Sequence, residues 1–113
     1  MEVTEEASAD VTIVAIAGRL DTQTSARFSH RLGELVHAGQ ARLLIEVSQL
    51  HYISSAGFRA LLLANKSATE RGGRLAVCGM TAPMQRVVDL AGLELAIETY
   101  PSREEALAKL ATH

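Results

Sequence analysis

The chain has 113 residues, of which 48% are hydrophobic and 21% are charged, and it carries a formal net charge of −2. This size fits one compact domain over residues 1–113, and the scattered Lys and Arg give no basic footprint for nucleic acid. No apolar run approaches the roughly 20 residues that span a bilayer, and the N-terminus is acidic where a signal peptide would be basic. We therefore expect a cytoplasmic protein without direct membrane insertion.

The N-terminal part predicts a hairpin followed by a helix. Residues 2–7 place Val3 between polar neighbours, which is compatible with an edge strand, and a turn at 8–10 leads into an apolar strand over 11–17. Residues 25–38 then place apolar side chains at helical spacing. A hairpin that feeds a helix begins a layered α/β arrangement.

The middle of the chain repeats strand and helix. Residues 43–47 and 74–78 are apolar on both faces, which is typical of strands covered on both sides of a sheet. Between them, residues 56–71 have a helical pattern that ends at two glycines. The single cysteine, Cys78, lies in the second of these strands, so we expect a buried and unreactive thiol.

The C-terminal part predicts two more helices with a strand between them. A helix over 83–90 has proline in its first turn and Gly92 just beyond its end, and residues 95–100 follow as a strand. Ser102 opens a capping box for the last helix. The predicted order is β-β-α-β-α-β-α-β-α, an α/β fold with a mixed central sheet of about five strands covered by about four helices.

Two adjacent serines lie between the strand predicted over 43–47 and the helix predicted over 56–71, directly before the helix. Ser54 and Ser55 precede Ala56 and Gly57 at this helix start. The first N–H groups of a helix lack partners inside it, so a serine there caps the helix or carries a phosphate that these groups stabilise. Capping is the commoner role. The residues alone leave both roles open.

Asp21 occupies a similar place before the helix over 25–38. It is a suitable N-cap, and Thr22 and Thr24 compete with it for that role. On the helix over 56–71, Leu63 falls among charged neighbours on the side opposite the core face, so we expect it to be exposed. An exposed leucine is either an ordinary surface residue or part of a contact surface.

The motifs together resemble the STAS family, and specifically its stand-alone bacterial anti-sigma-factor antagonists. The resemblance covers nearly the whole chain and is carried by four segments in register, namely Gly18–Asp21, Leu44–Leu50, Tyr52–Phe58 and Gly72–Gly79. It implies the STAS fold, which agrees with the element order predicted above.

The resemblance also implies a phosphorylation-controlled partner switch. The unphosphorylated antagonist would bind an anti-sigma factor that is also a serine kinase of the histidine-kinase-like ATPase type, which frees the sigma factor, and phosphorylation would release it. A phosphoserine phosphatase is a further implied partner. The family's phosphoacceptor position falls on Ser55. The implied partner-binding residues are Asp21, Ser54, Ser55, Ala56, Gly57, Arg59 and Leu63.

The chain departs from the family's motif at two positions. The motif's aspartate is Ser54 here, which makes Ser54 a second possible acceptor or the true cap, and its second glycine is Arg59. Arg59 follows Ser55 by one helical turn, so it can pair with a phosphate there or remain a solvated charge.

Other functions remain open beside the partner switch. One is a STAS subunit that docks on the ATPase of a lipid or solute ABC transporter, and another is a ligand-responsive STAS module. We expect no enzyme, since the chain has no Gly-x-Ser-x-Gly elbow, and no cofactor or metal, since it has no phosphate-binding glycine loop and no Cys or His cluster at metal spacing.

Overall fold

The computed structural model describes residues 1–92 and 96–110, and the predicted alternation of strands and helices is confirmed there. In chain order the elements are β1 (Glu2–Ser8), β2 (Val11–Leu20), α1 (Thr22–His37), β3 (Arg42–Ile53), α2 (Ser55–Glu70), β4 (Arg74–Cys78), α3 (Ala82–Ala91), β5 (Glu98–Tyr100) and α4 (Arg103–Leu110). None of the helices in this part of the chain is both long and apolar enough to cross a membrane.

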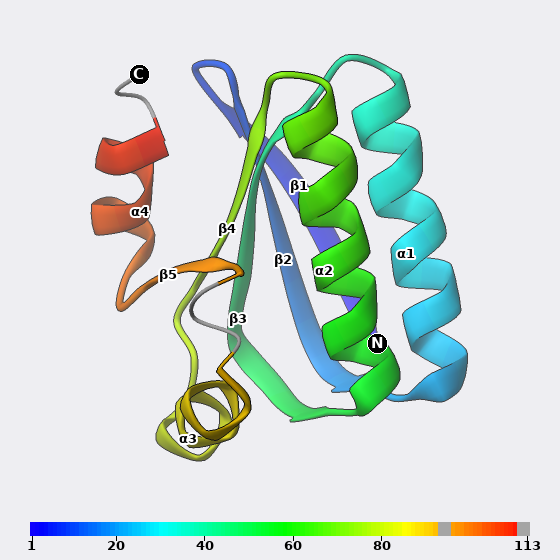
Figure 1. Cartoon of the computed structure of the whole chain (residues 1–113), viewed down its shortest axis with the longest axis vertical. Helices are drawn as coiled ribbons and strands as arrows, with labels where there is room; N and C mark the ends of the chain where they lie inside the picture. Colours follow the sequence, from blue (N-terminus) through cyan, green and yellow to red (C-terminus); the bar gives the residue numbers. More distant parts are fainter. Residues whose placement is uncertain (93–95, 111–113) are drawn as a thin grey trace.

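The strands form one mixed sheet of five strands in the order β1-β2-β3-β4-β5. β1 is antiparallel to β2, as a hairpin requires, and the remaining neighbours are parallel. Figure 1 shows the sheet nearly edge-on, with α1 and α2 side by side on one face and α4 on the other. The predicted mixed α/β sheet covered by helices is therefore confirmed.

Two apolar clusters hold these layers together. The larger joins the sheet to α1 and α2, and it includes Phe28, Leu32 and Leu61. The smaller lies under α4 and contains Leu110 and the fully buried Cys78. Burial raises the pKa of the Cys78 thiol to about 11, so the thiol is neutral near pH 7, as expected for a buried cysteine.

β3 is longer than the strand predicted over 43–47. The predicted C-terminal end was wrong, because the strand continues to Ile53. The polar Ser48 and Gln49 break the apolar run, yet the strand continues through them because it pairs with β2. The pairing shifts register and ends with Leu20 opposite Ile53. As a result, β2 and β3 end side by side, and both continue directly into helices.

The helix boundaries near the C-terminus follow the predicted signals. α3 ends at Gly92, whose φ of 71° is readily adopted by glycine, and α4 follows Ser102, whose Oγ accepts the Glu105 N–H at 3.2 Å. β5 is shorter than the strand predicted over 95–100, and residues 93–95 lie outside the described part of the chain.

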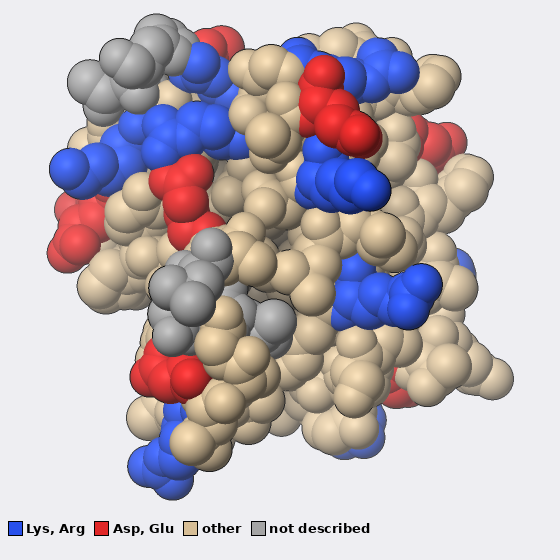
Figure 2. Space-filling model, viewed as in Figure 1, with Lys and Arg blue, Asp and Glu red and all other residues tan. Residues whose placement is uncertain are grey.

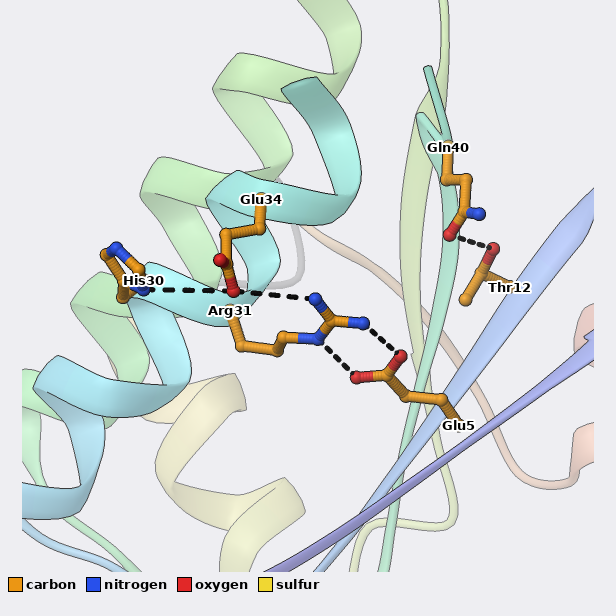
Figure 3. A network of polar contacts seen from close by, with 6 residues as sticks. All are labelled: Glu5, Thr12, His30, Arg31, Glu34 and Gln40. Carbon is orange, nitrogen blue, oxygen red and sulfur yellow. Dashed lines mark hydrogen bonds and ion pairs between the residues drawn. The ribbon is translucent and has the colours of Figure 1, made fainter. Parts of the chain in front are cut away.

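The edge strand β1 is tied to α1 by ion pairing. Arg31 of α1 donates from Nε and Nη2 to the two carboxylate oxygens of Glu5, each at 2.6 Å, and Figure 3 shows Glu34 on its other side. Hydrogen bonding to Arg31 lowers the pKa of Glu5. The paired charges of β1 also make its free edge a poor template for another strand.

Candidate functional site

The site forms where β2 and β3 end. The Ser54 N–H donates to the Leu20 carbonyl oxygen at 2.9 Å, which joins the residue after β3 to the last residue of β2. Asp21 directly follows Leu20, so Asp21 and Ser54 lie close together although they are far apart in the sequence. This is the carboxyl edge of the parallel strands, where sites in such sheets usually form.

Ser54 is the N-cap of α2. Its backbone is extended, its Oγ accepts the Gly57 N–H at 3.2 Å, and its carbonyl oxygen accepts the Phe58 N–H at 3.1 Å. Of the two roles left open by the sequence, the cap therefore belongs to Ser54. Ser55 is the first helical residue and is exposed, and its hydroxyl makes no hydrogen bond within the described residues.

Gly57 sets the first turn of α2 directly on the ends of the two strands. It is buried, and a Cβ atom at this position would lie 2.7 Å from Ile53 Cγ1 and 3.0 Å from Leu20 Cδ2. Such distances are shorter than ordinary carbon contacts. Gly57 therefore faces inward and fixes the height of Ser54 and Ser55 above the sheet, while its own surface is hidden.

Asp21 is the N-cap of α1. Its Oδ1 accepts the Thr24 N–H at 2.9 Å, and its own N–H donates to Thr24 Oγ1 at 2.8 Å, which closes a capping box. Hydrogen bonds from Thr24 lower the pKa of Asp21. Thr24 therefore completes the cap instead of competing for it, and Thr22 is the first helical residue.

This cap corrects the predicted start of α1. The sequence placed the helix start at Ser25, because the apolar spacing begins beyond it, but the helix begins at Thr22. The extra turn brings Ser25 inside the helix, where it is 4% exposed. It also places the N-termini of α1 and α2 beside each other, at the lower end of both helices in Figure 1.

The other predicted contact residues lie along α2. Ala56, Arg59 and Leu63 line an open hollow between α1 and α2, together with residues of α1 that include Ser25. Leu63 is 49% exposed, so its predicted exposure is confirmed. The predicted set thus divides into three parts. The exposed end holds Ser55 together with the half-buried Asp21 and Ser54, the hollow is lined by Ala56, Arg59 and Leu63, and Gly57 is buried.

Sequence reasoning missed one exposed pair at the same end of the sheet. Arg19 and Tyr52 are register partners on β2 and β3, and the Arg19 guanidinium carbon lies 4.3 Å from the centre of the Tyr52 ring. Such stacking of a cation on an aromatic ring holds both side chains in place. Only the strand register brings these residues together, so no local sequence signal could have found the pair.

The surface charge is mixed on the face that Figure 2 shows. Basic and acidic side chains are interspersed there, and the lower right of this view, where α1 and α2 begin, is mostly uncharged. Over residues 1–92 and 96–110, no group of three or more His, Cys, Asp or Glu is placed to hold a metal ion. The polar groups of the site are therefore the Ser54 and Ser55 hydroxyls, the Asp21 carboxylate and the guanidinium groups of Arg19 and Arg59.

A comparison with models of protein families shows which family the chain belongs to. The family model described as the STAS domain matches residues 2–106. The chain belongs to the STAS domain family. The resemblance that the motifs suggested is thereby confirmed, and the five-stranded mixed sheet with its helices is the fold of this STAS domain.

Relatives of this STAS domain include proteins described as antagonists of anti-sigma factors. The chain is 27% identical over 111 residues to the anti-sigma F factor antagonist of Paenibacillus polymyxa, covering 97% of this chain and 95% of that protein. The solved structure of an anti-sigma factor antagonist from Mycobacterium paratuberculosis matches with a TM-score of 0.88 and 22% identity, over 97% of this chain and 93% of that one.

A second solved structure matches a phosphorylated protein. The Bacillus cell fate determinant SpoIIAA in its phosphorylated form aligns with a TM-score of 0.74 and 16% identity, over 96% of this chain and 98% of that one. At identities of 22% and 16%, these two solved structures show that their fold is shared with this chain, and they show nothing about its function.

Proposed function

We propose that this STAS domain is an anti-sigma factor antagonist that is switched by phosphorylation of Ser55. In the unphosphorylated form it binds an anti-sigma factor that is also a serine kinase of the histidine-kinase-like ATPase type, which frees the sigma factor. Phosphorylation of Ser55 releases the complex, and a phosphoserine phosphatase restores binding. The protein acts in the cytoplasm, by binding and not by catalysis.

The observation that carries this proposal is that the two adjacent serines have different roles in the structure. Ser54 uses its Oγ to cap α2, whereas the hydroxyl of the exposed Ser55 is not needed by the described part of the fold. A kinase can therefore modify Ser55 without breaking a structural hydrogen bond. Ser54, the other acceptor that the sequence allowed, is less suitable because its Oγ already holds the first turn.

A phosphate on Ser55 would also suit its surroundings. The group adds a charge of about −1.5 to −2 at the positive end of a helix, where the free N–H groups and the helix dipole favour it. A partner surface fitted to a small neutral hydroxyl would not accept this charge, because desolvation and crowding oppose it. The fold tolerates the modification while the contact does not, as a switch requires.

The relatives support the proposal. The Paenibacillus polymyxa protein is named as an antagonist of an anti-sigma factor, and SpoIIAA has been solved in phosphorylated form on the same fold. The contact surface in this proposal is the exposed end and the α2 side of the hollow, made by Asp21, Ser54, Ser55, Ala56, Arg59 and Leu63, with Gly57 holding them in place.

The test is a binding and phosphorylation assay with the anti-sigma factor kinases of the same organism. Purified wild type and Ser55→Ala should bind one of them with similar affinity, and Ser55→Asp should bind at least about tenfold more weakly because it introduces a negative charge at the contact. With ATP, the kinase should label wild type and the control Ser67→Ala, and not Ser55→Ala.

The switch would be refuted if wild type, Ser55→Ala and Ser55→Asp bound the kinase equally well, or if the kinase labelled Ser55→Ala. Association with the permease or ATPase of an ABC transporter in place of a kinase would favour the transporter docking subunit, the alternative within this family.

A further inference from the structure

Arg19 and Tyr52 form an ordered and exposed pair at the end of the sheet that carries Ser55. The Arg19 guanidinium carbon lies 4.3 Å from the centre of the Tyr52 ring, and Tyr52 is 42% exposed. Neither side chain makes a hydrogen bond or an ion pair within the described residues. Stacking uses the faces of the two planar groups, so the N–H donors of Arg19 and the hydroxyl of Tyr52 remain available to another molecule.

A contact centred on Ser55 would include this pair. Tyr52 precedes Ser55 by three residues, so their Cα atoms are at most about 11 Å apart. Arg19 precedes Leu20, whose carbonyl oxygen accepts the Ser54 N–H. A standard interface covers about 800 Å² on each partner, which corresponds to a disc of roughly 16 Å radius. A protein that docks end-on over Ser55 therefore also covers Arg19 and Tyr52.

The pair extends the contact surface to the other side of the strand ends. Leu20 and Ile53, the next residues on the two strands, pack in the apolar cluster that joins the sheet to α1 and α2. Successive side chains of a strand point to opposite faces, so Arg19 and Tyr52 project from the face opposite to these helices. The surface at this end thus has Ser55 on one side and the stacked pair on the other.

The charges at this end favour an acidic partner surface. Arg19 and Arg59 are exposed cations, whereas the carboxylate of Asp21 is engaged by hydrogen bonds from Thr24. These hydrogen bonds and, to a smaller extent, the positive charge of Arg19 lower the pKa of Asp21. Glu2, on the neighbouring strand β1, forms no ion pair with Arg19. The guanidinium of Arg19 is therefore not neutralised by a carboxylate of this chain.

We propose that the stacked Arg19 and Tyr52 anchor the anti-sigma factor kinase by binding one of its carboxylate side chains, an assignment that rests on the proposed function. A guanidinium offers two parallel N–H donors to the two oxygens of a carboxylate. The Tyr52 ring already restricts the Arg19 side chain, so less conformational entropy is lost when the partner binds. Arg and Tyr are also among the residue types that most often dominate the binding energy of an interface.

The recognised group is a protein carboxylate and not the phosphate backbone of a nucleic acid. Binding along such a backbone uses a cluster of basic residues on one face or helix. The Lys and Arg of this chain are scattered, and its net charge is −2. A single ordered guanidinium beside an aromatic ring suits one acidic side chain of a partner protein.

A double-mutant cycle tests the anchor, with the anti-sigma factor kinase that binds wild type in the assay above. Arg19→Gln should weaken binding at least about tenfold, and Tyr52→Leu at least about threefold. The double variant should match Arg19→Gln within about twofold, because Tyr52 acts by holding Arg19. Arg71→Gln is the matched control, since Arg71 is exposed at the opposite end of α2, and its affinity should stay within about twofold of wild type.

A charge exchange tests the chemistry of the group that Arg19 binds. Arg19→Glu should bind more weakly than Arg19→Gln, because it brings two like charges together. Among kinase variants in which one exposed Asp or Glu is replaced by Lys, one should restore the binding of Arg19→Glu and weaken that of wild type. The urea midpoints of the Arg19 variants should stay close to that of wild type, because the side chain is exposed.

The inference would be overturned if Arg19→Gln bound as tightly as wild type, or if Arg71→Gln lost as much affinity as Arg19→Gln. It would also be overturned if no Lys variant of the kinase restored Arg19→Glu. A change in the oligomeric state of the chain alone in Arg19→Gln would assign the pair to a contact between copies instead. If Ser55→Asp weakens binding and Arg19→Gln does not, only the anchor fails, whereas both proposals fail if wild type binds no such kinase.

Discussion

Replacing Gly57 by alanine tests how the site is held on the sheet. The added Cβ would lie 2.7 Å from Ile53 Cγ1 and 3.1 Å from Leu20 Cγ, and Leu20 is fully buried. Overpacking of this kind costs about 1–3 kcal/mol, and the higher helix propensity of alanine offsets at most about 1 kcal/mol of it. We expect the free energy of unfolding to fall by about 1–2 kcal/mol.

Gly33→Ala is the matched control for this substitution. Gly33 is also a helical glycine, in α1, but a Cβ there would meet no atom within 4 Å. It gains the helix propensity without the clash, so its free energy of unfolding should rise by up to about 1 kcal/mol. The free energy of unfolding should therefore fall in Gly57→Ala and rise in Gly33→Ala, although both variants replace a helical glycine by alanine.

Urea unfolding followed by circular dichroism measures both effects. The midpoint should fall for Gly57→Ala and rise for Gly33→Ala, with an unchanged dependence of the free energy on urea concentration. If Gly57→Ala were as stable as Gly33→Ala, the first turn of α2 would not lie on the strand ends as described, and the account of how Ser55 is positioned would be wrong.

Three further predictions concern other parts of the fold and the site. Gly73→Ala should destabilise more than about 3 kcal/mol or prevent folding, since its Cβ would lie 2.1 Å from the Ala41 carbonyl oxygen, and a soluble variant of near wild-type stability in urea would contradict this. Asp21→Asn should be less stable than wild type at pH 7, because hydrogen bonds from Thr24 lower the pKa of the folded carboxyl. The extra stability of wild type is present above the pKa that the Asp21 carboxyl has in the unfolded chain, and it is lost as the pH falls through the pKa of the folded carboxyl. Thermal unfolding should therefore show wild type more stable than Asp21→Asn at pH 7, and the difference in stability should disappear near pH 2. Leu63→Gln should change the free energy of unfolding by less than about 0.5 kcal/mol because Leu63 is half exposed, yet weaken binding to the anti-sigma factor, and unchanged binding would remove Leu63 from the contact.

Much of the fold could be predicted because its signals are local. Apolar runs such as 74–78 mark strands covered on both faces, and Ser102 marks a helix start through its own side chain. The C-terminal half of β3 could not be predicted in this way. Ser48 and Gln49 are exposed, and the strand continues past the register shift at Ser48 because Gln49 and the residues after it pair with β2.

The sequence predicted that Ser54 and Ser55 lie where a strand is followed by a helix, but it did not predict which of them caps that helix. Two adjacent serines are both suitable caps, and the choice of Ser54 depends on its hydrogen bond to Leu20, a residue distant in the sequence. The burial of Ser25 could not be predicted for a similar reason. The cap at Asp21 moves it into the helix, and its burial beside the hollow depends on how α1 packs.

Phosphate mapping on protein purified from its own host tests the central claim most directly. Intact-mass and peptide mass spectrometry should find a single phosphate on wild type and on Ser54→Ala, where the cap is lost at a cost of about 1 kcal/mol but the acceptor remains, and none on Ser55→Ala. Phosphate retained in Ser55→Ala, or no phosphate on wild type under any growth condition, would contradict the account of Ser55 as the switch.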